Sequence, residues 1–153
     1  MTITSFLFAG YLFLSIYCAG SMTVLQLQHF ALYPKVGQDA FRAYINANNK
    51  AAVVPAILPA ILLLVINVIL LISRPDYLRL PFLITTLAMN LVNILSTAIW
   101  QGRIHSQLAS VGYDAILVDK LVKTNWIRTF ALLIQGLKAL FCTVNALNSI
   151  PKN

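Results

Sequence analysis

The sequence contains no glutamate, and aspartate supplies all four of its acidic side chains. Charged residues of both signs make up only 10% of the 153 residues, whereas a soluble domain carries about a quarter. Hydrophobic residues make up 59%, and the mean hydropathy is +0.81. Because so few charges cannot cover a water-facing surface, this composition excludes an ordinary soluble domain. It indicates that the lipid bilayer is the natural solvent of the chain.

Cysteine is scarce as well, with Cys18 and Cys142 in two different apolar runs. Two isolated cysteines exclude a disulfide framework and a zinc ribbon, and we expect both to be small packing residues. No serine or cysteine stands in a recognisable nucleophile motif, so hydrolase signatures are absent. A zinc site would need a third protein ligand beside the two histidines, and there is no glutamate to supply it.

Four apolar runs, at about residues 3–27, 51–72, 80–100 and 126–147, dominate the sequence instead. Each is long enough to cross a hydrocarbon core of about 30 Å, which needs about 20 apolar residues. Backbone polar groups must be satisfied inside lipid, so the runs are expected to be helices. The sequence therefore predicts an all-α, up-down four-helix membrane bundle that forms a single domain over residues 1–153. No basic residue precedes the first run, which we interpret as a retained anchor rather than a cleaved signal.

The connection between the first two runs carries its own helix signal. The spacing of Phe41, Tyr44 and Ile45 predicts a short helix that lies at the membrane interface. Pro59 then removes a backbone hydrogen bond near the start of the second span and is expected to bend it.

The third span is expected to run on to about residue 110, with Gly112 as its stop. Residues 113–123 are amphipathic and predict a separate short surface helix. This helix would lead to the segment TNWIRT, residues 124–129, which we expect at the start of the last span.

The net charge of +7 raises the question of a nucleic-acid partner. The basic residues are interleaved with the spans instead of clustered, so anionic lipid headgroups are the expected partners and nucleic acid is not. Seven bases fall on one side and three on the other, with Lys138 inside the fourth span. The positive-inside rule then places both termini on the non-cytoplasmic side, of what we expect to be a bacterial inner membrane. The two groups are Lys35, Arg42, Lys50, Arg103, Lys120, Lys123 and Arg128, against Arg74, Arg79 and Lys152.

Polar side chains recur at helical spacing along each span, and polar groups in lipid turn inward to hydrogen-bond across helices. Each predicted helix therefore has a definable inner face, which favours a compact bundle. The four faces comprise Tyr11, Ser15, Cys18, Met22, Gln26 and His29; Asn49, Ala56, Ala60 and Asn67; Thr86, Asn90, Asn93, Thr97, Gln101 and His105; and Asn125, Arg128, Gln135 and Cys142.

Up-down threading brings both histidines, both tryptophans and an asparagine–arginine pair to one membrane level. One interpretation is an interfacial belt, with tryptophans at headgroup depth and basic residues beside phosphates. The other is a polar pocket at the inner leaflet. In that pocket the candidate catalytic residues are His105, Arg128 and Asn125. The candidate ligand-binding residues are His29, Gln26, Asn49, Trp100, Gln101 and Trp126.

Several smaller expectations concern the ionisable groups. We expect no metal and no resident cofactor, with haem held between His29 and His105 as a minor alternative. Asp114 or Asp119 would orient His105 as an acid–base residue. Lys138 is expected to extend toward the outer face, and the alternative is that it faces an internal cavity.

The segment W-QGR-IH-SQL-ASVG-Y-D…KLVKTNWIRT, residues 100–129, resembles a family of small bacterial four-span membrane proteins with a W-x3-IH-x2-L…G…TNWIRT pattern. The resemblance extends upstream to YPKVG-QDAF-RAY and VVPAILPAILLL, and it implies fold and topology more than activity. That pattern places histidines after residues 41–44 and a glutamate in the second span. Ile45, Asn46 and Asn48 stand in the first region here, and ILLLV in the second. A more distant similarity to anthrone-oxygenase-like membrane proteins implies a lipophilic aromatic substrate.

Three functions are consistent with the sequence. The first is a membrane protein that binds a lipophilic molecule in the inner-leaflet pocket, with cofactor-free oxygenase or other redox chemistry as a further step. His105 would act there as acid and base, and Arg128 and Asn125 would stabilise negative charge. The second is an accessory or structural subunit of a larger membrane complex. The third is a transporter or channel, which four helices can form only as a homo-oligomer.

Overall fold

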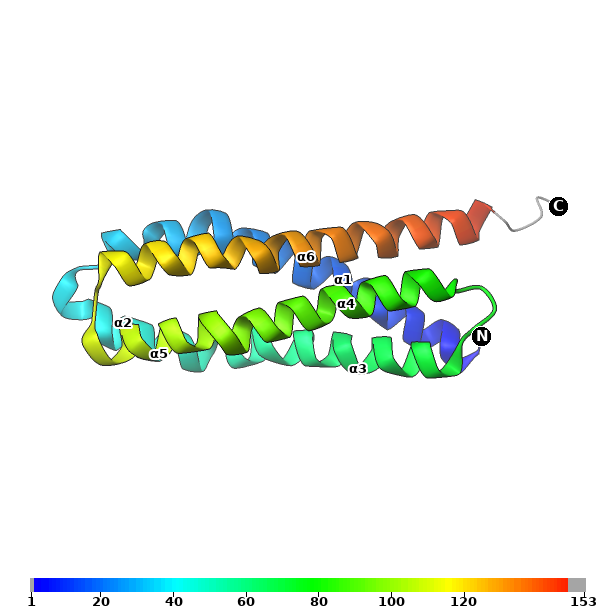
Figure 1. Cartoon of the computed structure of the whole chain (residues 1–153), viewed down its shortest axis with the longest axis horizontal. Helices are drawn as coiled ribbons and strands as arrows, with labels where there is room; N and C mark the ends of the chain where they lie inside the picture. The colour runs from blue at the N-terminus through cyan, green and yellow to red at the C-terminus, as the bar shows by residue number, and fades with distance from the viewer. Residues whose placement is uncertain (1, 149–153) are drawn as a thin grey trace.

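The computed structural model describes residues 2–148, and every regular element among them is a helix. The helices form four long stretches that run up and down (Figure 1). Residues 2 and 148 and the connection 74–79 lie at one end of the bundle, which we call the terminal end. The connections 36–37 and 112–114 lie at the other, which we call the far end. The predicted all-α up-down bundle is confirmed. The stretches comprise α1 (Ile3–Val24), η1 (Leu25–His29) and η2 (Phe30–Lys35); α2 (Gln38–Ala51), η3 (Val53–Ile57) and α3 (Leu58–Ser73); α4 (Leu80–Ser96), η4 (Thr97–Gln101) and α5 (Gly102–Val111); and α6 (Ala115–Asn148).

The four stretches are long and apolar enough to cross a membrane, over Ile3–Lys35, Val53–Ser73, Leu80–Val111 and Ala115–Ala146. Large hydrophobic side chains cover the outside of the bundle, including Phe6, Phe13 and Ile72, which are 67%, 68% and 77% exposed. Apolar patches of this extent do not remain in contact with water. The fold is compatible with an integral membrane protein.

The polar faces predicted from helical spacing point inward. Asn67 donates to Thr86 at 3.2 Å and accepts from Asn90 at 3.3 Å, which links α3 to α4. Gln135 on α6 donates to the hydroxyl of Tyr11 on α1 at 3.1 Å. All five side chains are buried. Because lipid offers these groups no partner, such contacts hold the helices in one arrangement.

The second span begins with a distortion near Pro59, the residue at which a bend was predicted. Residues 53–57 form a π-helical turn, and Pro59 occupies the first turn of α3. In an α-helix residue 59 would donate to the carbonyl oxygen of Pro55, but proline has no N–H. The hydroxyl of Tyr17 on α1 donates to that oxygen instead, at 2.9 Å. A neighbouring helix thus satisfies the backbone group that the proline leaves free.

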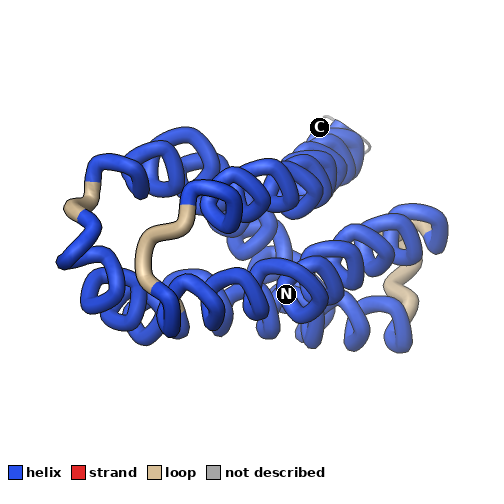
Figure 2. Tube along the Cα trace, turned by 60° about the vertical axis from the view of Figure 1, so that its left-hand side comes forward, coloured by secondary structure: helices blue, strands red, loops and turns tan. Residues whose placement is uncertain are grey.

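The helix predicted after the first span is present as α2, but its apolar face does not lie on the membrane surface. Phe41 and Ile45 are fully buried in a cluster with Leu108 of α5 and Leu121 of α6. The Nε atom of Arg42 donates to the carbonyl oxygen of Ala109 at 3.3 Å. The helix α2 therefore extends the bundle at the far end. Residues 36–37 connect it to η2, and it continues through Ala52 into η3 (Figure 2).

The last helix begins earlier than predicted. Gly112, with φ of 90°, ends α5 as expected, and α6 then starts at Ala115. Oδ1 of Asp114 accepts hydrogen bonds from the backbone N–H groups of Ile116 and Leu117, at 2.8 and 2.9 Å. This N-cap lets the amphipathic residues 115–123 continue directly into the apolar run. The separate surface helix was a wrong prediction, and TNWIRT lies inside α6 instead of at its start.

Candidate functional site

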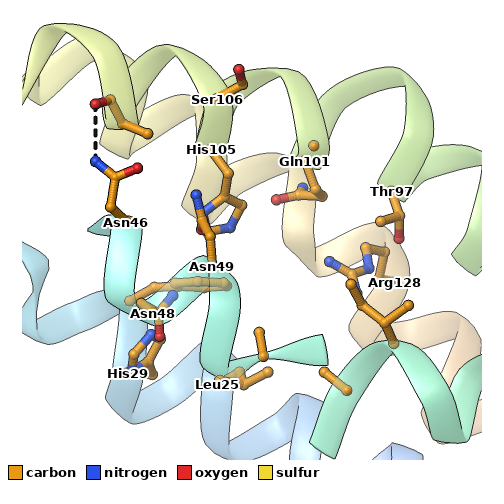
Figure 3. Close-up of a pocket in the computed structure, with 16 residues that line it drawn as sticks. Leu25, His29, Asn46, Asn48, Asn49, Thr97, Gln101, His105, Ser106 and Arg128 are labelled. Atoms are coloured by element: carbon orange, nitrogen blue, oxygen red, sulfur yellow. Dashed lines mark hydrogen bonds between the residues drawn. The ribbon is translucent and has the colours of Figure 1, made fainter. Parts of the chain in front are cut away.

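A cavity of about 470 Å³ lies at the far end of the bundle, where α2, α5 and α6 meet the end of α1. Figure 3 shows His105 and Gln101 pointing from their helix toward the segment that carries Asn49, with Arg128 beside the same space. The wall is polar on several sides and apolar elsewhere. The lining residues are Leu25, His29, Phe30, Asn46, Asn48, Asn49, Ala52, Ala56, Ile57, Thr97, Gln101, Gly102, His105, Ser106, Ala109 and Arg128.

All three π-helical turns of the chain's described part contribute to this wall. The turn η1 supplies His29, η3 supplies Ile57, and η4 supplies Thr97 and Gln101. A π turn inserts one residue into an α-helix and rotates the side chains that follow, and such turns are frequent at functional sites. Three helical stretches depart from α geometry around the same cavity, and this concentration of π turns favours a functional site here.

Arg128 is the cationic side chain that lines the cavity. Its Nε atom donates to Oδ1 of Asn93 at 3.1 Å, and its Nη1 atom donates to Oδ1 of Asn125 at 3.3 Å. Within residues 2–148 the one ion pair joins Lys123 to Asp119, so no carboxylate lies within 4.0 Å of Arg128. A guanidinium carries five N–H donors, and neutral amides engage only two here. The positive charge of Arg128 and its three remaining N–H donors can therefore interact with another group, such as a ligand.

Asn125 and Gln26 form a layer behind Arg128. The Nδ2 atom of Asn125 donates to Oε1 of Gln26 at 2.7 Å, and Nε2 of Gln26 donates to the carbonyl oxygen of Val122 at 3.2 Å. Both side chains are buried and neither lines the cavity. The pair joins α6 to η1 and fixes the amide oxygen that holds the guanidinium.

His29 belongs to a second group of hydrogen bonds on the opposite wall. Its Nε2 atom lies 3.3 Å from the hydroxyl of Tyr33, and Nδ2 of Asn48 donates to that hydroxyl at 3.3 Å. The three groups are all satisfied when Tyr33 donates to Nε2, which places the proton of the neutral imidazole on Nδ1. The ring of Tyr44 lies 6.3 Å from that of His29, and burial raises the pKa of the Tyr44 phenol.

His105 and Gln101 keep hydrogen-bonding capacity that the described residues do not use. Nδ1 of His105 and Oε1 of Gln101 are enclosed and have no hydrogen-bond partner in residues 2–148. The other end of the Gln101 amide donates to Oγ1 of Thr124 at 2.8 Å. A buried polar group without a partner costs about 1–3 kcal/mol. Both residues line the cavity, and each keeps one hydrogen-bonding atom that residues 2–148 do not use.

The expected orientation of His105 by a carboxylate was wrong. Asp114 caps α6, and Asp119 forms its exposed ion pair with Lys123 at 2.7 Å. Because α6 starts at Ala115, both carboxylates interact with α6 itself and not with His105 of α5.

The structure brings together five of the predicted site residues as cavity wall: His29, Asn49, Gln101, His105 and Arg128. Of the rest, Gln26 and Asn125 lie behind the wall. The two tryptophans lie elsewhere, since Trp100 is 38% exposed on the outside and Trp126 stacks on Phe130 with ring centroids 5.2 Å apart.

Sequence reasoning did not select four polar lining residues, Asn46, Asn48, Thr97 and Ser106. The signal for the first two was the asparagine-rich stretch INANNK in a helix with one apolar face. Thr97 belonged to the predicted polar face of its span. Nothing in the sequence around Ser106 indicates that it lines a cavity, apart from its position next to His105.

No group of three or more His, Cys, Asp or Glu side chains that can hold a metal is found in the described part of the chain. His29 and His105 line one cavity. No protein-family model, no curated protein and no solved structure matches the sequence or the fold.

Proposed function

We propose that this chain is a membrane protein that binds a lipophilic molecule through an anionic oxygen, such as a carboxylate or an enolate, in the cavity beside Arg128. The observation that carries the proposal is the guanidinium that lines the cavity with only Asn93 and Asn125 as partners. A buried charge without an opposite charge is costly, and an anionic ligand removes that cost. A guanidinium also matches the geometry of a carboxylate, with two parallel hydrogen bonds.

The remainder of the cavity suits the apolar part of such a ligand. Its volume of about 470 Å³ falls in the usual range of small-molecule sites, about 300–1,000 Å³. Leu25, Phe30, Ala56 and Ile57 supply an apolar wall next to the polar one. A lipophilic molecule would place its body against these side chains and its oxygen toward Arg128.

The residues then divide into binding and chemical roles. Arg128 holds the oxygen, Asn93 and Asn125 position Arg128, and Gln101 offers a hydrogen-bond acceptor. His105 lines the same cavity and would take a proton from an acidic C–H or O–H group of the ligand. The resulting anion would be stabilised by Arg128 in a site with little water. An oxygenase without a cofactor begins with such a proton removal, followed by reaction of the anion with molecular oxygen.

The proposed location of the protein is a bacterial inner membrane, with both termini on the non-cytoplasmic side. Among the described residues, seven basic side chains lie toward the far end, whereas Arg74 and Arg79 lie at the terminal end, and the positive-inside rule assigns the richer end to the cytoplasm. The cavity would then open at the level of the inner leaflet, where lipophilic molecules partition.

A binding titration in mild detergent tests the proposal. The probe is a fluorescent long-chain fatty acid, and the matching fatty alcohol serves as its uncharged control. We expect the acid to bind and the alcohol to bind more weakly. Arg128→Met is expected to weaken binding of the acid by roughly 10- to 100-fold, since a hydrogen bond to a charged group contributes about 1.5–3 kcal/mol.

Arg103→Met is the matched control, because Arg103 is an exposed arginine of α5 that does not line the cavity. It is expected to leave binding unchanged. Equal binding of acid and alcohol, or an unchanged affinity in Arg128→Met, would contradict the proposal. Absence of any binding would instead favour the accessory-subunit function.

A further inference from the structure

A second hollow lies at the terminal end of the bundle, between the beginning of α4 and the later turns of α6. Its volume is about 920 Å³. Two cationic side chains from different helices line it: Arg79, which is the N-cap of α4, and Lys138, which belongs to α6. We call this hollow the terminal groove.

Neither cation of the terminal groove forms an ion pair within residues 2–148. Asp76 lies in the same connection as Arg79, yet no carboxylate comes within 4.0 Å of Arg79 or Lys138 in residues 2–148. Lys138 is only partly exposed and follows the fully buried Gln135 by one helical turn. Lys138 of α6 and Arg79 at the beginning of α4 thus line the same hollow at the terminal end of the bundle.

Apart from Thr85 and Asn145, the rest of the terminal groove is largely apolar, and it opens onto the exposed hydrophobic surface of the bundle. Phe82 of α4 forms part of its wall, as do Leu137 and Phe141 of α6. The two α6 side chains are 66% and 68% exposed, so acyl chains of the bilayer have direct access to them. Tyr77, 42% exposed, stands at the rim, in the position typical of aromatic residues at a membrane interface.

We propose that the terminal groove is a binding site for an anionic phospholipid. The phosphate would lie between Arg79 and Lys138, and an acyl chain would follow Phe82, Leu137 and Phe141 toward the middle of the bilayer. A lipid phosphate between these two cations, which have no carboxylate partner within residues 2–148, would neutralise both of them. The site is at the opposite end from Arg128, so it neither requires the proposed ligand cavity nor depends on it.

The chain contains its own reporter for this site. Cys142 lines the terminal groove and is partly exposed, whereas Cys18 is buried. In a Cys18→Ala background, a maleimide reports occupancy through the rate at which it labels Cys142. The probes are short-chain phosphatidylglycerol and phosphatidylcholine, each added to the protein in detergent, with inorganic phosphate as a third addition.

We expect phosphatidylglycerol to slow the labelling of Cys142, phosphatidylcholine to do so much less, and inorganic phosphate to have no effect. Arg79→Met and Lys138→Met are each expected to weaken protection by phosphatidylglycerol about fivefold, following the usual contribution of a basic residue near an anionic surface. Lys138→Arg keeps the charge and is expected to retain protection. Arg74→Met is the matched control, since Arg74 is an exposed base of the same connection outside the groove.

Equal protection by the two lipids, or undiminished protection in the Arg79→Met, Lys138→Met double variant, would overturn the proposal. Protection by inorganic phosphate alone would show a free-anion site and would equally overturn it. Loss of protection in Arg74→Met to the same degree would point to general surface charge instead of a built site.

Discussion

The Nε atom of Arg128 donates a hydrogen bond to Oδ1 of Asn93 across the packed helices α4 and α6, at 3.1 Å. An aspartate of nearly the same shape would neutralise the arginine at this position, but the chain has an amide. The amide orients the guanidinium and leaves its charge uncompensated. Arg128 is thus held in position beside the cavity by a neutral amide, and no carboxylate of residues 2–148 neutralises its charge.

The hydrogen bond from Asn125 to Gln26 is expected to stabilise both the fold and the position of Arg128. Replacing either residue by alanine leaves a buried amide without its partner and should lower the free energy of unfolding by about 1–3 kcal/mol. A double-mutant cycle in mixed micelles should give a coupling of about 0.6–1.7 kcal/mol, the range found for hydrogen bonds between membrane helices. Purely additive effects would show that the 2.7 Å contact contributes nothing to stability.

The carboxylate of Asp114 is expected to set the start of α6 without affecting ligand binding. Asp114→Ala removes the acceptor for two backbone N–H groups and should lower stability by about 1 kcal/mol, whereas Asp114→Asn should lower it much less. Thermal unfolding in detergent measures the loss, and the fatty-acid titration serves as the control. A marked fall in ligand affinity for Asp114→Ala with unchanged stability would instead favour a role of this aspartate at His105.

The hydroxyl of Tyr17 is expected to compensate for the missing N–H of Pro59. Tyr17→Phe should lower the free energy of unfolding by roughly 1 kcal/mol. In a Pro59→Ala background, the new N–H at position 59 can donate to the carbonyl oxygen of Pro55. Tyr17→Phe should therefore lower the free energy of unfolding by less in that background. The same cost in both backgrounds would mean that the 2.9 Å contact does not replace the helical hydrogen bond.

Much of the fold follows from local properties of the sequence. Hydropathy and helical spacing are read from neighbouring residues, so they predicted the spans and the inward faces that carry Tyr11, Asn67, Thr86, Asn90 and Gln135. Up-down threading then placed His29 and His105 at one end, and the structure has both on one cavity wall.

What the sequence did not predict depends on how the helices are rotated and where they start. The π turns η1 and η4 each add a residue to a turn, so side chains beyond them shift around the helix axis relative to an α-helical projection. Trp100 lies within such a turn and faces outward. The start of α6 depends on one side chain, the cap at Asp114, which the sequence pattern placed within a separate surface helix over residues 113–123.

The most direct test of the central claim, that the free charge of Arg128 binds an anionic ligand, is the fatty-acid affinity of Asn93→Asp at neutral pH. The new carboxylate would pair with Arg128, so we predict at least about a tenfold loss of affinity with stability equal to or above wild type. Asn90 lies one helical turn away and is hydrogen-bonded to Asn67. Asn90→Asp would bury a carboxylate that has no cation beside it, and it should lower stability by about 3–5 kcal/mol. Unchanged fatty-acid affinity in a folded Asn93→Asp protein would contradict the account.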